Sequence, residues 1–232
     1  MQWRANIGLI SPALSVAETA FNRYAPKGVE IATTRIRLKE VPEETDDGFV
    51  PRMEKAAEVL AESPKDIILF GCTIGSCING YGWDEECIRR LEKHGRAPAT
   101  TTINACMDAF RALKLKRIAM LTPYPEYRTQ IQKDFLEAHG FELPIAVSMN
   151  ADQYGGVITQ ERLYQIVKKL DLSQVAGVFI SCMKLHTMEI IEPLEQDLRL
   201  PVISSHSASL WSVLRKCGVH ERIPHVGQLL DL

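Results

Sequence analysis

Two cysteines stand at the ends of two apolar segments that resemble each other. The segment "IILFGCT" contains Cys72, and the segment "GVFISCM", much later in the chain, contains Cys182. A short apolar run bounded by turn residues is typical of a buried strand. Each thiol is therefore predicted at the carboxyl end of a strand, which is where open parallel sheets bind their ligands.

A thiol at such a place can be packing, a metal ligand or a catalytic group. Cysteine is commonly buried and inert, so packing stays open as an alternative for each thiol taken alone. No structural zinc site is expected, because the chain has no C-x-x-C pair and its six histidines are scattered. A thiolate is also a good nucleophile and a base for carbon acids, and nearby amide N–H groups lower its pKa. The matching positions of the two thiols favour catalysis.

Two thiols on opposite faces of a planar carbon permit two kinds of reaction. In racemisation, one thiolate removes a proton next to a carboxylate and the other thiol donates one on the opposite face. In cis–trans isomerisation, one thiolate adds to an alkene carbon and the other thiol protonates its neighbour, before rotation and reversal. Both need hydrogen-bond donors for the charge that develops on the carboxylate, and neither needs a metal or cofactor. No metal and no cofactor are therefore expected.

Strands and helices are predicted to alternate along the chain. Apolar runs indicate strands over residues 5–10, 28–36, 66–72, 96–103, 116–122, 141–149, 175–182 and 200–205, and helical patterns cover residues 49–62, 83–95, 104–115, 125–140, 159–172, 187–198 and 207–218. Such alternation is typical of α/β proteins with parallel sheets flanked by helices.

Three pairs of segments also repeat in the same order in the two halves. The pairs are "IGLISP" with "IAMLTP", "IILFGCT" with "GVFISCM", and "RAPATTTINA" with "RLPVISSHSA". Generic similarity between parallel βα units is one explanation. The alternative that we favour is two similar lobes about a pseudo-twofold axis, which would place Cys72 and Cys182 on opposite walls of one cleft.

Composition excludes several classes of partner. The 232 residues are 46% hydrophobic, which suffices for a sizeable core, and the net charge is only −2. No basic stripe or acidic tail indicates binding to nucleic acid or membrane lipid. The apolar segment that ends at Pro12 is too short for a signal peptide, and no run approaches a membrane span. The six cysteines do not form a disulfide pattern, and a reducing cytosol would keep them as thiols. Together these features predict a cytoplasmic protein.

Four segments carry a resemblance to a known family: "GCTIG", "LTPYPEY", "SCMKLHTMEIIEPLE" and "LPVISSHSASLWSVLR". The chain resembles the aspartate/glutamate racemase superfamily, and within it the branch of maleate cis–trans isomerases and arylmalonate decarboxylases. The resemblance implies two Rossmann-like lobes, with the final helix of one half packed on the other lobe, and a homo-oligomer. Lobe one would comprise residues 1–98 and 207–232, and lobe two residues 99–206.

The resemblance also implies roles for individual residues. Cys72 and Cys182 match the two family cysteines, and decarboxylases of this branch have glycine in place of Cys72. Having both thiols therefore favours an isomerase or racemase. Side-chain and backbone donors would bind the carboxylates of the substrate, and the residues expected to line its site are Ser11, Pro12, Thr73, Ile74, Tyr124, Gln153, Met183 and Lys184.

Some positions depart from the maleate isomerase pattern. The maleate isomerases that the chain resembles have an asparagine near the position of Leu14 and Ser15. They have a second asparagine at the position of His206. These differences indicate a different or partly apolar acid. The first hypothesis is a maleate-type cis–trans isomerase that acts on a small carboxylic or dicarboxylic acid. The alternatives are an amino- or hydroxy-acid racemase, an arylmalonate-type decarboxylase, and a small-acid binding protein without turnover.

Overall fold

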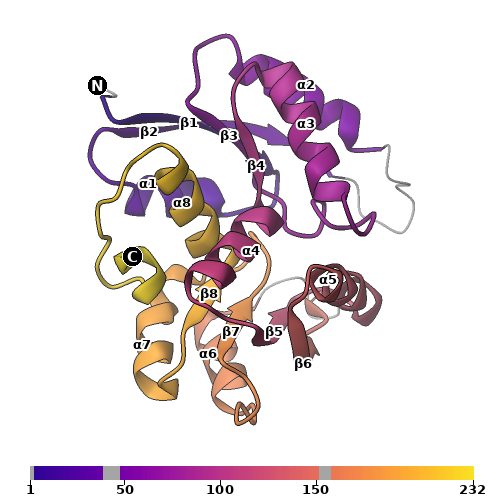
Figure 1. Ribbon diagram of the computed structural model, residues 1–232, viewed down its shortest axis with the longest axis vertical. Helices are drawn as coiled ribbons and strands as arrows, with labels where there is room; N and C mark the ends of the chain where they lie inside the picture. The colour runs from indigo at the N-terminus through magenta and orange to yellow at the C-terminus, as the bar shows by residue number, and fades with distance from the viewer. Residues whose placement is uncertain (1–2, 39–47, 152–157) are drawn as a thin grey trace.

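Strands and helices alternate through the structure, a computed structural model that describes residues 3–38, 48–151 and 158–232 (Figure 1). The first half contains β1 (Ala5–Pro12), α1 (Ala17–Tyr24), β2 (Val29–Ile36), α2 (Val50–Leu60), β3 (Ile67–Phe70), α3 (Trp83–Gly95), β4 (Ala99–Thr101) and α4 (Thr102–Ala112). The second half contains β5 (Arg117–Thr122), α5 (Glu126–Ala138), β6 (Glu142–Ser148), α6 (Gln160–Lys168), β7 (Gly177–Ile180), α7 (Met188–Leu198), β8 (Val202–Ser204) and α8 (Ser205–Lys216), followed by the short 3-10 helix η2 (Gln228–Asp231).

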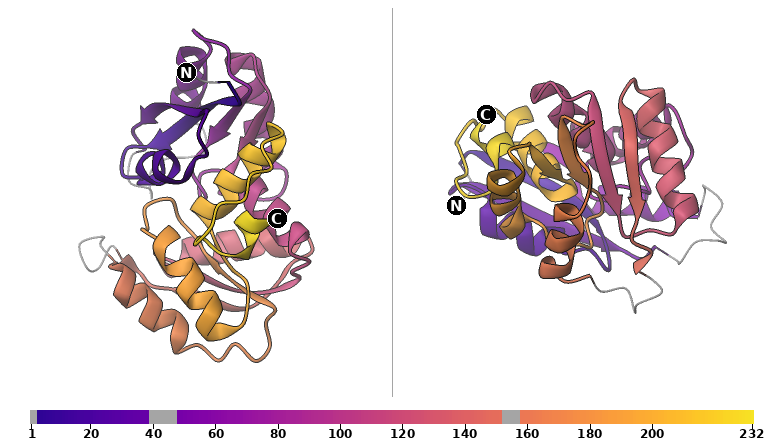
Figure 2. Two further views of the ribbon diagram at one scale, coloured as in Figure 1. Left: turned by 90° about the vertical axis from the view of Figure 1, so that its left-hand side faces the viewer. Right: turned by 90° about the horizontal axis from the view of Figure 1, so that it is seen from below.

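The strands form two parallel sheets with the same topology. The order is β2-β1-β3-β4 in the first sheet and β6-β5-β7-β8 in the second. Equivalent strands also pair in similar register, with Ile10 opposite Phe70 in one sheet and Leu121 opposite Ile180 in the other. Each sheet belongs to its own lobe (Figure 2). The prediction of an α/β fold with two similar lobes is confirmed.

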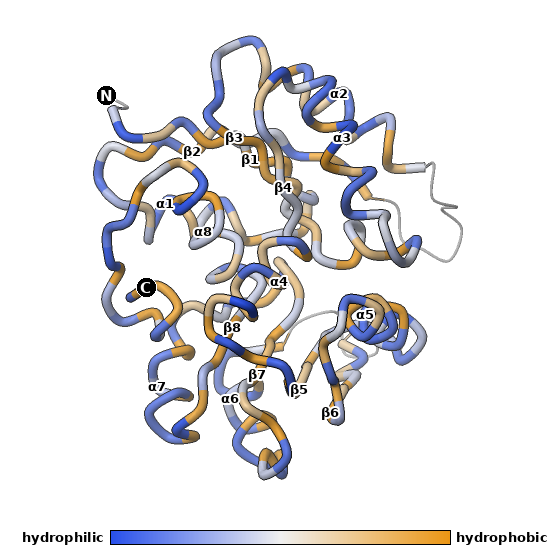
Figure 3. The backbone as a smooth tube through the Cα atoms, in the orientation of Figure 1, coloured by the Kyte–Doolittle hydropathy of each residue, from blue (hydrophilic) through white to orange (hydrophobic). Residues whose placement is uncertain are grey.

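The central strands are buried on both faces. All four residues of β3 and all four of β7 are buried, so both strands read as continuous apolar runs. Hydrophobic segments accordingly gather along the strands inside each lobe (Figure 3). Burial of this kind fixes the position of the loop that follows each strand, and each of these two loops carries a cysteine.

Helices α4 and α8 cross between the lobes and pack against each other. Apolar side chains of α4, including Phe110, share a core with Phe179 of the second sheet. In turn, Leu210 and Val213 of α8 share a core that includes Ile7 of the first sheet. Each half of the chain thus supplies a helix that covers the other half, as the resemblance implied.

The boundary between the lobes differs slightly from the expected one. Strand β4, Ala99–Thr101, pairs with β3 in the first sheet, so this sheet extends beyond the expected boundary at residue 98. The contact of α8 with β3 and α1 supports grouping α8 with the first lobe, whereas the Gln228 amide, near the chain's end, donates to Glu195 of α7 in the second lobe. The division of the chain into two lobes at these residues remains a proposal.

Helices α4 and α8 begin earlier than predicted, because hydroxyl side chains cap them. The Thr101 side chain accepts a hydrogen bond from the Asn104 amide at 3.2 Å, and Ser204 accepts one from Ser207 at 3.1 Å. Such caps satisfy amide groups that have no partner inside the helix. Helix α1 was not predicted at all. It has only eight residues, and Ala17 and Phe21 alone are buried.

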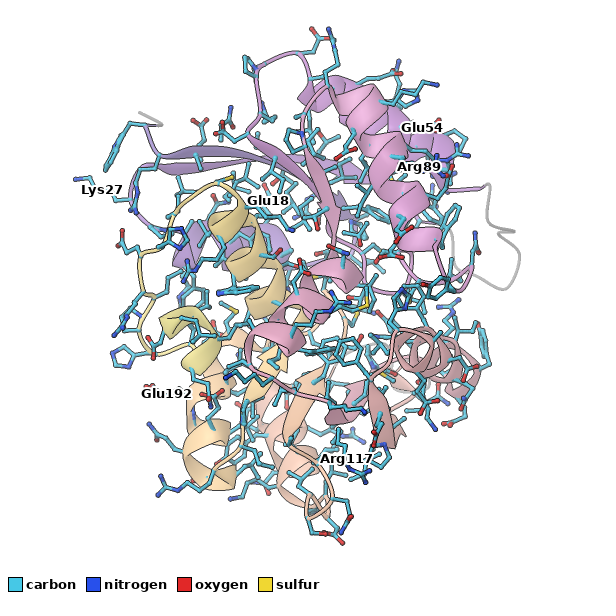
Figure 4. All side chains as sticks on the ribbon, viewed as in Figure 1. Glu18, Lys27, Glu54, Arg89, Arg117 and Glu192 are labelled. Atoms are coloured by element: carbon cyan, nitrogen blue, oxygen red, sulfur yellow. The ribbon has the colours of Figure 1, made fainter. Side chains whose placement is uncertain are left out.

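Charged side chains lie on the outside of the lobes. Figure 4 shows Glu54, Arg89, Arg117 and Glu192 at the outer edges of the molecule. Arg117, for example, pairs with Glu142 at 2.7 Å, and exposed pairs of this kind contribute little to stability. Within the described ranges, no helix combines the length and the apolar character needed to cross a membrane.

Candidate active site

The two cysteines lie where the lobes meet. Cys72 follows β3 and Cys182 follows β7, and the two residues are only 5% and 9% exposed. Their thiols lie close enough that negative charge on Cys182 raises the pKa of Cys72. The structure therefore brings together the two thiols that the sequence placed on matching strand ends.

The Cys72 thiol is held by the turn that follows it. The Gly75 amide donates a hydrogen bond to Cys72 Sγ at 3.4 Å, and Ser76 donates through both its amide and its hydroxyl to the Cys72 carbonyl. A Cβ atom at position 75 would lie 2.9 Å from Sγ. Only glycine therefore leaves the thiol in this position without displacement.

Opposing effects set the ionisation of Cys72. Burial raises the pKa of its thiol to about 12, while the Gly75 hydrogen bond and the Arg128 guanidinium oppose the rise. A thiol with this pKa is protonated at neutral pH. Thiolate formation then depends on positive charge and amide groups near the sulfur.

Cys182 has an unusual backbone conformation. Its φ angle is +102°, a region that residues with a side chain rarely adopt, at a cost of order 1–3 kcal/mol. The Lys184 amide donates to Cys182 Sγ at 3.4 Å, and the Cys182 amide donates to Ser205 Oγ at 2.9 Å. Both thiols thus accept a hydrogen bond from an amide of their own loop.

Three amide groups beside the thiols are not used by the protein. Within the described residues, the N–H groups of Thr73, Ile74 and Met183 donate no hydrogen bond. Thr73 and Met183 are almost completely buried. Because buried amides are nearly always paired, these three are ready donors for a bound anion. The Lys184 amide differs from expectation, because it is already bound to the Cys182 thiol.

Tyr124 lies next to both thiols. Burial raises the pKa of its hydroxyl well above the ordinary value, and the Cys182 and Cys72 thiols raise it further. The Tyr124 amide donates to Thr122 Oγ1 at 3.2 Å and its carbonyl accepts from Ser148 Oγ at 2.7 Å. The phenol therefore stays protonated at neutral pH, and it shares a side-chain hydrogen bond with Cys182.

The corner after β1 supports the Cys182 loop. Ser11 is fully buried at the end of β1, next to Pro12. A few residues later, Ser15 Oγ donates to the Met183 carbonyl at 3.1 Å, and the Val16 amide donates to the same carbonyl at 2.9 Å. Ser15, near the place of a family asparagine, thus fixes this loop. Gln153 lies outside the described residues.

Three other cysteines, Cys77, Cys87 and Cys106, are buried. Cys77 is buried, and its Sγ contacts the carbonyls of Thr73 and Ile74 at 3.4 and 3.5 Å. Cys87 and Cys106 are buried in α3 and α4. His186, four residues after Cys182, is exposed.

His206 lies in the first turn of α8 rather than on a strand end. It is 1% exposed, and its Nδ1 lies 3.3 Å from Thr187 Oγ1. Burial lowers its pKa to about 4, so the ring is neutral at pH 7. A neutral imidazole does not supply the positive charge that would attract a carboxylate.

Two residues near the thiols were not predicted. Arg128 of α5 acts electrostatically on Cys72, and Ser205 of α8 contacts both Thr73 and Cys182. The repeated hydroxyl-rich segments "ATTT" and "ISSH" were the one signal that pointed toward Ser205.

The fold and the site define a two-lobed α/β protein in which each lobe contributes one buried thiol to a shared site. A family model described as arylmalonate decarboxylase matches residues 7–230, and the chain belongs to this family. The resemblance proposed from the sequence is thereby confirmed.

Similar proteins include several maleate isomerases. The maleate isomerase of Geobacillus stearothermophilus is 26% identical over an alignment of 250 positions, which covers 97% of this chain and 96% of the relative. A solved structure of the maleate isomerase Iso from Pseudomonas putida S16, a cysteine-to-alanine variant with maleate, has a TM-score of 0.88 at 23% identity and covers 98% of this chain and 97% of that one. The maleate cis–trans isomerase of Nocardia farcinica, solved as a cysteine-to-serine variant with a covalently bound succinylcysteine intermediate, has a TM-score of 0.88 at 23% identity, with coverage of 97% and 98%. The prediction of an isomerase is confirmed by these relatives.

Proposed function

We propose that this protein is a cofactor-independent cis–trans isomerase of a maleate-type dicarboxylic acid. The observation that carries the proposal is the pair of buried thiols, each followed by amide groups that have no acceptor among the residues that the structure describes. Two thiols can serve the two faces of an alkene, and two sets of amides can bind its two carboxylates. The maleate isomerases among the relatives support this substrate class.

The reaction would begin with addition of a thiolate to the double bond. Cys72 is the proposed nucleophile, because the Gly75 amide and the Arg128 charge both favour its thiolate. The C–S bond forms at one alkene carbon, and the electron pair of the double bond moves toward the conjugated carboxylate. The Cys182 thiol then protonates the neighbouring carbon, which leaves a succinyl group on Cys72.

Rotation and reversal would complete the isomerisation. The former double bond is now a single bond, so its two carbons can rotate. The Cys182 thiolate takes a proton back from the same carbon, the C–S bond breaks, and the trans acid leaves. Thiol, thiolate and proton are all restored, so no redox partner or metal is needed.

Donors around the thiols would stabilise the charge on the carboxylates. The Thr73 hydroxyl, the amides of Thr73, Ile74 and Met183, and the Tyr124 hydroxyl are the proposed donors. Donors that are already oriented lower the barrier, because they need little rearrangement as negative charge grows on oxygen. Ser11, Pro12, Lys184 and Gln153 remain proposed neighbours of the substrate, with the Lys184 amide assigned to the Cys182 thiol instead.

We further propose that the enzyme acts in the cytoplasm as a homo-oligomer, as the cysteine usage and the family resemblance suggest. Racemisation of an amino or hydroxy acid is the second candidate, because the same two thiols would serve it.

Proton NMR of maleate incubated with the purified protein tests the proposal. Conversion to fumarate is expected for wild type and for Cys217→Ser, a partly exposed thiol beyond the end of α8 that serves as control. Cys72→Ala and Cys182→Ala should each abolish conversion. If maleate is unchanged but the α-proton of one amino or hydroxy acid enantiomer exchanges in deuterium oxide, the racemase is the correct function.

A further inference from the structure

We infer that Ser205 is a positioning residue that couples the two thiol loops through a single hydroxyl group. Its Oγ lies 2.9 Å from Thr73 Oγ1 in the loop after Cys72, and it accepts the Cys182 amide at 2.9 Å. Ser205 is completely buried and Thr73 is 1% exposed. One side chain therefore joins the loops of two different lobes. The consequence for catalysis rests on the proposed function.

The hydrogen bond to Cys182 holds a backbone that would otherwise relax. The Cys182 amide lies two residues beyond the end of β7, where φ is +102°, and it needs an acceptor outside the strand pairing. Ser205 Oγ supplies that acceptor. Removing the hydroxyl leaves the buried Cys182 amide without an acceptor. The hydrogen bond that stabilises this backbone conformation is then lost.

The chain of donors has one direction when an acid is bound. A carboxylate only accepts hydrogen bonds, so Thr73 must use its own proton to donate to the acid. As long as Thr73 and Ser205 stay bonded, the proton between them then comes from Ser205, which accepts the Cys182 amide and also contacts the Cys106 thiol. The sequence of donors is Cys182 amide, Ser205, Thr73 and carboxylate. Each bond polarises the next and strengthens the last one.

The first half of the chain provides an internal comparison. Thr102 opens α4 as Ser205 opens α8, but Thr102 Oγ1 donates to the Phe70 carbonyl at 3.2 Å. The Cys72 amide donates to that same carbonyl at 3.0 Å. Cys72, moreover, is not among the residues with positive φ. Of these two hydroxyls, only Ser205 accepts the amide of a cysteine, and only its cysteine has a positive φ.

Hydrogen exchange of the Cys182 amide tests the inference without an activity assay. The Cys182 amide should exchange at least 10-fold faster in Ser205→Ala than in wild type, and Ser205→Thr, which keeps the hydroxyl, should restore slow exchange. Ser205→Cys, a near-isosteric change to a weak acceptor, should resemble Ser205→Ala and covers the case in which the alanine variant does not fold. Ser209→Ala is the matched control: Ser209 is also buried on α8, but it bonds Thr102 instead.

Kinetics on the substrate then test the coupling. Ser205→Ala and Thr73→Val should each lower kcat/KM about 10- to 100-fold, and the double variant should be little worse than either single one. Ser209→Ala and Thr73→Val should combine independently. Unchanged exchange at Cys182 in Ser205→Ala, or independent effects of Ser205 and Thr73, would overturn the inference. Absence of turnover in wild type would contradict the proposed function alone, because the exchange result stands without it.

Discussion

Gly75 and Cys72 form a tight pair: the Gly75 amide donates to Cys72 Sγ at 3.4 Å, and a Cβ atom on Gly75 would approach the same sulfur to 2.9 Å. The glycine both stabilises the thiolate and leaves room for it. This relationship depends on the absence of a side chain, so the smallest possible addition tests it.

Gly75→Ala should lower kcat by about 10- to 1,000-fold, within the range of losing one preorganised donor, because the methyl group displaces Sγ from its position. Gly75 does not have a positive φ, so alanine introduces no backbone strain. Steady-state kinetics with maleate provide the measurement, and a circular dichroism melt checks the fold. Wild-type kcat in a folded Gly75→Ala protein would show that the position of the Cys72 thiol is not critical.

Tyr124→Phe should weaken turnover by a similar 10- to 1,000-fold, because it removes one hydroxyl donor while retaining the ring. The control is Tyr127→Phe, since Tyr127 is half exposed at the start of α5 and is not assigned to the site. The two variants are compared by kcat/KM on the same acid. Equal kinetics for Tyr124→Phe and wild type would remove this hydroxyl from the site.

Strain at Cys182 predicts an unusual order of stability. Glycine adopts a φ of +102° easily and alanine does not, so Cys182→Gly should be more stable than Cys182→Ala by about 1 kcal/mol. Urea unfolding measures the difference. The matched control is Cys77, which has no positive φ; there glycine should be less stable than alanine by about 0.5–1 kcal/mol. If the glycine and alanine variants had the same order of stability at positions 182 and 77, backbone strain at Cys182 would be contradicted.

Ionisation of Cys72 predicts the pH dependence of its alkylation. The thiolate is the reactive form, and burial raises the pKa of this thiol from 9.0 to about 12. Its rate of reaction with iodoacetamide should therefore rise about tenfold per pH unit and should still be rising at pH 10. In the urea-unfolded chain, the rate should reach half its maximum near pH 9.0 and level off at about one pH unit above that. Peptide mass spectrometry measures both rates, and a plateau below pH 9 in the folded protein would contradict the assigned pKa.

The same shift has a consequence for stability. The folded protein binds the Cys72 proton more tightly than the unfolded chain does. The contribution of the protonated Cys72 thiol to the free energy of unfolding is therefore complete below pH 9 and is lost as the pH rises toward 12.

Much of this site could be predicted from the sequence. Cys72 and Cys182 follow apolar runs whose burial on both faces fixes where each strand ends, so the pattern of the sequence is sufficient to place them. The repeat of short segments likewise indicated two lobes. Both features depend on local patterns, which a single sequence records.

Other features depend on contacts between distant segments. Ser205 meets Thr73 only because α4 and α8 cross between the lobes, and no local pattern records that crossing. The positive φ of Cys182 could not be predicted from its residue type, because glycine is the residue that usually adopts this conformation. Helix α1 is too short for its periodicity to be distinct. Arg128 was missed because it acts on Cys72 across the boundary between the lobes.

The central claim is that Cys72 adds to the double bond and Cys182 supplies and removes the proton. The most direct test is intact-protein and peptide mass spectrometry of Cys182→Ser, Cys72→Ser and wild type after incubation with maleate. We expect a stable succinyl adduct on Cys72 in Cys182→Ser and no adduct in Cys72→Ser. In Cys182→Ser the serine hydroxyl can still protonate the neighbouring carbon and regain a proton from solvent, but neutral serine is too weak a base to remove that proton again and complete the reversal. An adduct on Cys182 in the Cys72→Ser protein, or full conversion of maleate by either variant, would contradict the account.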